Sequence, residues 1–155
     1  MAIEGLGVST MRSLFVIIAV VAGFIPGAFA DLDEARFQGS TRDFRYDVRM
    51  RFKPAPPTRR SPDAPKYWTV FDTLLVILDG REINAPKAAL DGLFWPHPSG
   101  SPYPGPDGTL RIPISGGSGE YSYEAVLVFS RSRLVEVERR EHASTKWKIK
   151  KYSGR

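Results

Sequence analysis

The residues best suited to bind a charged ligand gather near the C-terminus. Residues 131–155 contain nine basic and three acidic residues, so this segment alone accounts for the net charge of +5. The lysines there alternate with apolar residues and would line one face of an extended strand. A basic sheet face of this kind is typical of proteins that bind polyanions. The alternative is a solvated edge strand whose lysines prevent aggregation. The residues concerned are Lys146, Lys148, Lys150, Arg139 and Arg140.

Two aromatic residues in a proline-rich stretch form a second candidate binding group. If Trp95 and Tyr103 are exposed, they could stack on a sugar ring or contact a partner protein. If they fold back over the core, they gain hydrophobic free energy by burial. The sequence leaves both alternatives open.

The residues that could catalyse hydrolysis are few and lie far apart in the sequence. Asp72 interrupts an apolar stretch, where a buried carboxyl group could act as an acid or base. An ion pair with an arginine is the structural alternative. His97 and His142 are the only histidines, which is fewer than the three or four ligands of a zinc site. There is no nucleophile-elbow motif. We therefore predict no catalytic residue, no metal and no cofactor, and name Asp72 and His142 as the first residues to test in a hydrolase.

A mainly β domain must position these candidates. Residues 44–53 alternate five apolar with five charged residues, which predicts a half-buried antiparallel strand. Residues 67–78 are apolar on both parities, as in a central strand that is covered on both faces, at least in part. The Asp79-Gly80 pair that follows predicts a turn. Asn84 could cap a short helix over residues 86–91. Further strands are expected over residues 109–114, 121–129, 134–140 and 146–152.

These elements predict about six antiparallel strands with one short helix, ending in a meander. A small sandwich, an open barrel and a curled sheet all fit this pattern. We expect one β-rich domain over residues 43–155, with proline-rich loops at 54–65 and 95–108, after a flexible N-terminal lead at 31–42.

The first 30 residues have the pattern of a cleavable export signal. Arg12 precedes an apolar run over residues 14–25, a Pro-Gly pair follows, and Ala28 and Ala30 occupy the positions that signal peptidase prefers. The run is shorter than the roughly 20 apolar residues of a membrane span. The chain has no cysteine, so an exported product would be stabilised by its core and not by disulfides. We expect a periplasmic or secreted protein without a membrane span after cleavage.

Residues 69–152 resemble a loosely defined group of small, exported, uncharacterised bacterial β-rich proteins. The shared features are Asp79-Gly80, Pro86, Gly116-Gly117, the strand around Tyr123 to Phe129, and Lys146-Trp147. The resemblance implies a small β domain and no particular activity. The two proline-rich loops are departures from it.

The sequence thus favours a non-enzymatic interaction or binding module of unknown ligand. Proline-rich loops on a rigid sheet are common places for binding residues. A protein of the cell envelope or exterior is the expected partner. The alternatives are a polyanion-binding protein that uses the basic C-terminal face, and a hydrolase with an unrecognised site.

Overall fold

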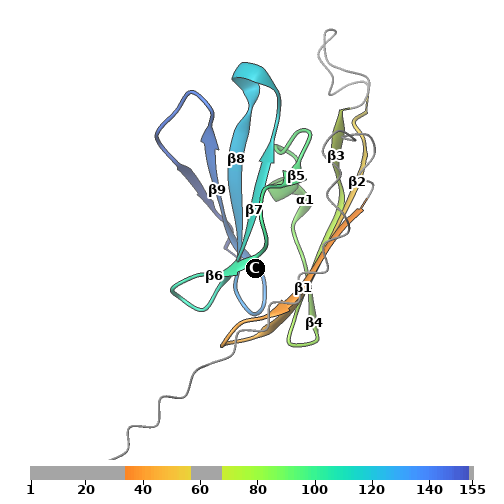
Figure 1. Ribbon diagram of the computed structural model, residues 1–155, viewed down its shortest axis with the longest axis vertical. Coiled ribbons are helices and arrows are strands. Elements are labelled where there is room, and N and C mark those ends of the chain that lie inside the picture. Colours follow the sequence, from red (N-terminus) through yellow and green to blue (C-terminus); the bar gives the residue numbers. More distant parts are fainter. Residues whose placement is uncertain (1–33, 57–67, 154–155) are drawn as a thin grey trace, which may run out of the picture.

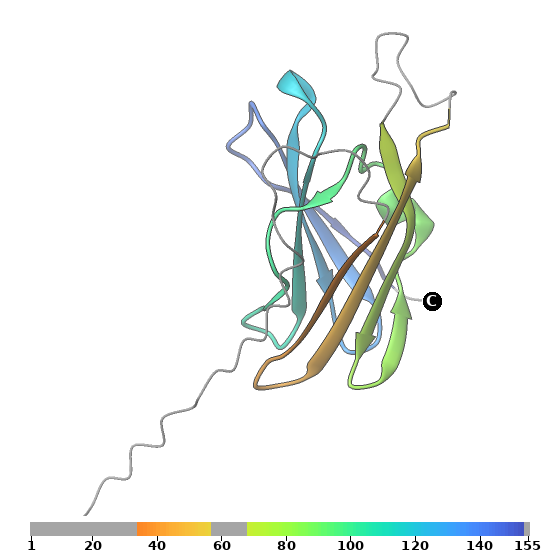
Figure 2. The same cartoon turned by 45° about the vertical axis from the view of Figure 1, so that its right-hand side comes forward.

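Two antiparallel sheets lie face to face and enclose one hydrophobic core (Figure 1, Figure 2). The structure is a computed structural model that describes residues 34–56 and 68–153. Within these ranges the chain is mainly β, with one α-helix and no closed barrel. The predicted fold class is therefore confirmed, and the sandwich is the architecture among the three alternatives.

The first sheet has the strand order β1-β2-β3-β4. The alternation over 44–53 forms β2, in which Val48, Met50 and Phe52 are buried. The β3 strand is buried mainly on one face: Leu74, Val76 and Leu78 are buried, whereas Leu75 and Ile77 between them are only half-buried. The four strands are β1 (Glu34–Ser40), β2 (Arg45–Pro54), β3 (Thr69–Leu78) and β4 (Arg81–Asn84).

The prediction of a flexible lead was wrong for residues 34–40. This segment pairs along its whole length with β2, in the register Glu34 to Arg51 through Ser40 to Arg45. The pairing is reinforced at Asp47 on β2, which accepts hydrogen bonds from Arg36 at 2.7 Å and from Gln38 at 3.1 Å. The Arg36 guanidinium holds the pKa of Asp47 well below its usual range. In residues 34–40 exposed and half-buried positions alternate, but most of the residues are polar, so the sequence shows no clear strand pattern. Pairing with β2 stabilises this strand.

The second sheet contains the predicted C-terminal meander. Its order is β10-β9-β8-β7-β5, and β6 also pairs with β7. The proline-rich loop 95–108 therefore contributes two very short strands. The strands are β5 (His97–Pro98), β6 (Tyr103–Pro104), β7 (Leu110–Gly116), β8 (Tyr123–Phe129), β9 (Leu134–Glu141) and β10 (Lys148–Lys151).

The helix is shorter than predicted and has a different start. It is α1 (Lys87–Leu90), and Pro86 stands at its N-cap without a side-chain hydrogen bond. Asn84 ends β4 and caps nothing, because its backbone pairs with Leu75 of β3. A 3₁₀ turn, η2 (Gly119–Tyr121), connects β7 to β8. It takes Tyr121 out of the predicted strand and leaves this side chain 71% exposed.

The core draws on both sheets and on α1. Inward side chains of β2 and β3 pack in one cluster with those of β7, β8 and β9. Fully buried members include Val48, Ile112, Leu127 and Phe129. Each such side chain contributes about 1.5–3 kcal/mol through burial. A chain without cysteine depends on this contribution for its stability.

Several predicted segments fall outside the described residues. They are the export signal at 1–30, the start of the lead at 31–33, and most of the first proline-rich loop, at 57–65. Within the described ranges there is no helix with both the length and the apolar character of a bilayer span.

Candidate functional site

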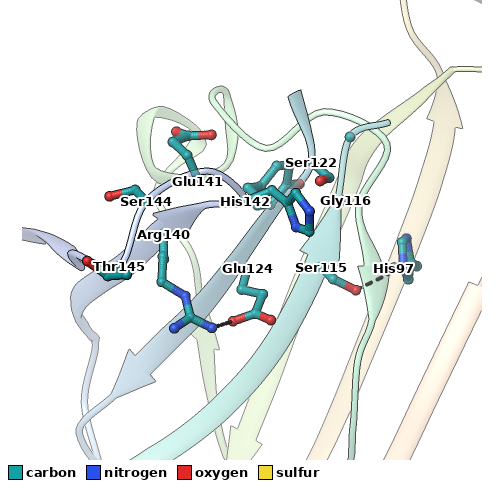
Figure 3. Close-up of a pocket in the computed structure, with 12 residues that line it drawn as sticks. His97, Ser115, Gly116, Ser122, Glu124, Arg140, Glu141, His142, Ser144 and Thr145 are labelled. Atoms are coloured by element: carbon teal, nitrogen blue, oxygen red, sulfur yellow. Dashed lines mark hydrogen bonds and ion pairs between the residues drawn. The ribbon is translucent and has the colours of Figure 1, made fainter. Parts of the chain in front are cut away.

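A polar hollow of about 560 Å³ lies over one end of the second sheet (Figure 3). The end of β7, the start of β8, the end of β9 and the turn before β10 all contribute to it. The β5 strand adds His97 from the proline-rich loop. The residues that line the hollow are His97, Ser115, Gly116, Gly117, Ser122, Tyr123, Glu124, Arg140, Glu141, His142, Ser144 and Thr145.

Strand register aligns a polar row across the floor of this hollow. Ser115 pairs with both His97 and Glu124, and Glu124 pairs with Arg140. These residues occupy the face turned away from the first sheet, since Ile114 and Ala125 beside them are buried in the core. Opposite positions on neighbouring strands bring their side chains within reach of one another. The sheet therefore places an imidazole, a hydroxyl, a carboxylate and a guanidinium side by side.

A charged pair occupies the middle of the row. Arg140 Nη2 donates to Glu124 Oε2 (Figure 3), and the Arg140 guanidinium lies 5.0 Å from the centre of the Trp147 ring. A guanidinium fixed on two sides keeps its remaining N–H groups oriented. The pair offers a ligand both hydrogen-bond donors and acceptors, with little net charge.

The Ser115 hydroxyl lies beside His97 at the other end of the row. Ser115 Oγ is 2.9 Å from His97 Nε2, and His97 Nδ1 is 3.4 Å from the carbonyl oxygen of Trp95. In the tautomer with the proton on Nδ1, the carbonyl orients the ring and Nε2 accepts from Ser115. Trp95 has φ of +47°, a left-handed conformation that is uncommon for a bulky residue. Such conformations concentrate at functional sites.

The loop that carries Trp95 and His97 is hydrogen-bonded to the second sheet. The Tyr123 hydroxyl donates to the carbonyl oxygen of Phe94 at 3.1 Å, and the backbone N–H of Gly117 donates to the same oxygen at 3.1 Å. Burial raises the pKa of Tyr123, so its hydroxyl stays a donor at ordinary pH. The buried end of β8 thus sets the position of His97.

Some polar side chains of the hollow are left for a ligand. Among the described residues, the imidazole of His142 and the hydroxyl of Thr145 make no hydrogen bond or ion pair within the chain. The backbone of His142 is fixed, since its N–H donates to the carbonyl oxygen of Ser122 at 2.9 Å. Figure 3 shows His142 between Ser122 and Glu124, over the polar row. The His142 side chain thus extends from a fixed backbone position, and its ring nitrogens are available to a ligand.

The structure does not gather the predicted basic residues on one face. Arg140 faces the hollow, whereas Arg139 points to the opposite face, stacks on Tyr123 and donates to the carbonyl oxygen of Gly92 at 2.6 Å. Lys148 and Lys150 share the Arg139 face by register, and Lys146 lies before β10. Consecutive residues of a strand point to opposite faces.

The predicted aromatic and acidic candidates are also separated. Trp95 contributes to the hollow only through its carbonyl oxygen, which lies near His97 Nδ1. Tyr103 lies on β6 opposite Arg111 and does not line the hollow. Asp72 lies on β3 of the other sheet and accepts a 2.7 Å hydrogen bond from Lys53. The structure therefore does not bring Asp72 and His142 together.

Sequence reasoning named Arg140 and His142 as candidates, and the structure places both in the hollow. It did not bring His97 and His142 into one site, and it did not single out Ser115 or Glu124. The only signal in the sequence is that polar residues stand at outward positions near strand ends. That signal becomes informative once the register of four strands is known.

Comparison with known proteins finds no matching family model, no matching curated protein and no matching solved structure. The resemblance noted for residues 69–152 stays a prediction. In the described part of the chain, no group of three or more His, Asp or Glu side chains is placed to hold a metal ion.

Proposed function

We propose that this protein is an exported, non-enzymatic binding module and that the hollow binds a polar, hydroxyl-rich ligand of the saccharide class. The observation that carries the proposal is the Glu124–Arg140 pair with the unengaged His142 and Thr145 beside it. A sugar hydroxyl both donates and accepts hydrogen bonds, which matches groups of both kinds. Binding sites commonly combine a few such fixed polar groups with a concave surface.

The charge balance of the hollow favours a sugar over a strongly anionic ligand. Arg140 is paired with Glu124, and Arg139 forms a 3.0 Å ion pair with Glu141. An exposed aromatic ring lies next to a lining residue, since Trp147, which is 41% exposed, lies against Arg140. Aromatic rings with one polar neighbourhood and one open face can stack on the C–H face of a sugar.

The test is binding of the mature, labelled protein to an array of neutral and anionic glycans, followed by calorimetric titration with the best oligosaccharide. Replacing Glu124 with glutamine should weaken binding by about tenfold or more, because a hydrogen bond to a charged group is worth about 1.5–3 kcal/mol. Thr145→Ala should weaken it less, since a neutral hydrogen bond is lost.

Thr73→Ala provides the matched control, because Thr73 is exposed on β3 of the other sheet. It should bind the oligosaccharide as the unaltered protein does. The proposal fails if no glycan binds, or if Glu124→Gln and Thr145→Ala bind as tightly as the Thr73 control.

A hydrolase is the second candidate, and the Ser115–His97 hydrogen bond favours it. A serine becomes nucleophilic when a base lies within hydrogen-bond distance. The carbonyl of Trp95 takes the orienting position that a carboxylate holds in a Ser-His-Asp triad. Ser115 Oγ would attack an ester carbonyl carbon and pass its proton to His97, which would return it to the leaving alkoxide. Water would then release the acid from the serine.

A fluorophosphonate probe separates the two candidates. If the protein is a hydrolase, the probe should label Ser115, and labelling should disappear in Ser115→Ala but persist in Ser122→Ala, another serine of the hollow. Absence of labelling in the unaltered protein, or equal labelling of both variants, would remove the hydrolase candidate and leave the binding module.

A further inference from the structure

The β10 strand leaves one edge of the second sheet open. Among the described residues it ends the strand order and pairs with β9 alone. The Tyr152 N–H donates to the carbonyl oxygen of Val135 at 2.8 Å, which continues this register. Because hydrogen-bonded pairs alternate in antiparallel sheets, Lys148 and Lys150 also bond to β9. The backbone N–H and C=O groups of Ile149 and Lys151 therefore face the open edge.

The two faces of this edge differ in chemistry. Lys148 and Lys150 lie on one face, opposite Arg139 and Val137. No carboxylate within the described ranges forms an ion pair with either lysine, and Lys148 opposite Arg139 is a like-charge pair, which is unfavourable across strands. Trp147 and Ile149 lie on the other face and are 41% and 58% exposed.

An edge built only to resist aggregation would have another composition. Protective edges place charges where a neighbouring chain would dock and avoid exposed apolar residues. Here two of the four large hydrophobic residues exposed in the described part of the chain, Trp147 and Ile149, lie on or beside β10. The edge combines open backbone groups, apolar surface and two lysines that form no ion pair in the described residues, although Lys150 Nζ lies 5.3 Å from the centre of the Tyr152 ring.

We propose that β10 binds an extended segment of a partner protein by strand addition, and that acidic and apolar residues alternate in this segment. Its backbone would pair with Ile149 and Lys151, as in known cases of strand addition. Its carboxylates would lie beside Lys148 and Lys150 and offset the repulsion from Arg139. Its apolar side chains would cover Trp147 and Ile149. This surface shares Trp147 with the proposed sugar site, because Trp147 lies against Arg140, but it does not include Glu124.

Two peptides of equal composition test the proposal with the full mature protein. One alternates glutamate and valine over six residues, and the other carries three glutamates followed by three valines. The alternating peptide should bind roughly tenfold more tightly, because only it places charges and apolar groups on opposite faces. On binding, the amide hydrogens of Ile149 and Lys151 should become protected from exchange. Equal affinity for both peptides, no binding, or unprotected amides would overturn strand addition.

Variants of the edge separate strand addition from binding of a polyanion. Ile149→Pro removes an N–H that faces outward and should abolish peptide binding while leaving binding of polyphosphate, if any, unchanged. Lys148→Glu/Lys150→Glu should also abolish peptide binding, whereas Arg42→Glu/Arg81→Glu makes the same charge change at exposed positions near the other sheet and should not. Tight binding of polyphosphate without preference between the peptides would assign the edge to polyanions. Glu124→Gln should leave peptide binding intact, so this proposal and the sugar site fail independently.

Discussion

Replacing Phe129 with alanine should lower the free energy of unfolding by about 3–5 kcal/mol. Phe129 is fully buried at the end of β8, where inward side chains of both sheets meet. Truncation removes the burial of the ring and leaves a cavity that the two sheets cannot close. A domain of this size has a total stability of about 5–15 kcal/mol, so the variant should be close to unfolding.

Urea denaturation followed by tryptophan fluorescence and circular dichroism measures this loss. Tyr121→Ala is the matched control, because it also truncates an aromatic residue but one that is 71% exposed. Its stability should change by no more than about 0.5 kcal/mol. A loss at Phe129 below about 1 kcal/mol would contradict the packing of the two sheets around this residue.

Gly116→Ala should both destabilise the protein and disturb the hollow. A Cβ atom at Gly116 would lie 2.7 Å from the carbonyl oxygen of Phe94 and would also meet the Tyr123 hydroxyl. The Phe94 carbonyl is the point where Tyr123 holds the loop that carries His97. We expect a loss of about 1–3 kcal/mol in stability from overpacking. The loop should also shift, which breaks the hydrogen bond between Ser115 and His97.

Urea denaturation measures the stability, and NMR of the His97 ring reports the hydrogen bond. Gly100→Ala is the control in the same proline-rich loop, since its Cβ would make an ordinary 3.4 Å contact with Pro113. It should change neither readout. Adding Tyr123→Phe to Gly116→Ala should restore part of the stability, because the Tyr123 hydroxyl, the nearest of the three atoms that conflict with the added Cβ, is removed. An additive loss in the double variant would refute this account of the glycine.

Much of the fold follows from local patterns. The alternation at 44–53 and the turn at Asp79-Gly80 predict β2 and the hairpin that follows β3, and the structure has both. The C-terminal meander is also present as predicted. The first strand was missed because its residues are mostly polar. It is stabilised by pairing with β2, by Ala35 and Phe37 packed against the core, and by the hydrogen bonds to Asp47.

The candidate site was not predictable in the same way. Its polar row joins positions 97, 115, 124 and 140, which lie on four strands that must first be placed in register. Period-two patterns assign each residue to one of two faces but leave the order and offset of the strands open. Arg139 and Arg140 are an example: they are neighbours in sequence, but their side chains lie on opposite faces of the sheet.

The sequence by itself determined the class of the fold, since the alternation of apolar and polar residues is a local property of each strand. It also determined that the core must hold this cysteine-free chain together. The tertiary structure alone decided that His97, Ser115 and His142 border one hollow and that the basic C-terminal residues divide between two faces. The reason is physical: a strand fixes the direction of its side chains, whereas their neighbours are fixed by the register of the sheet.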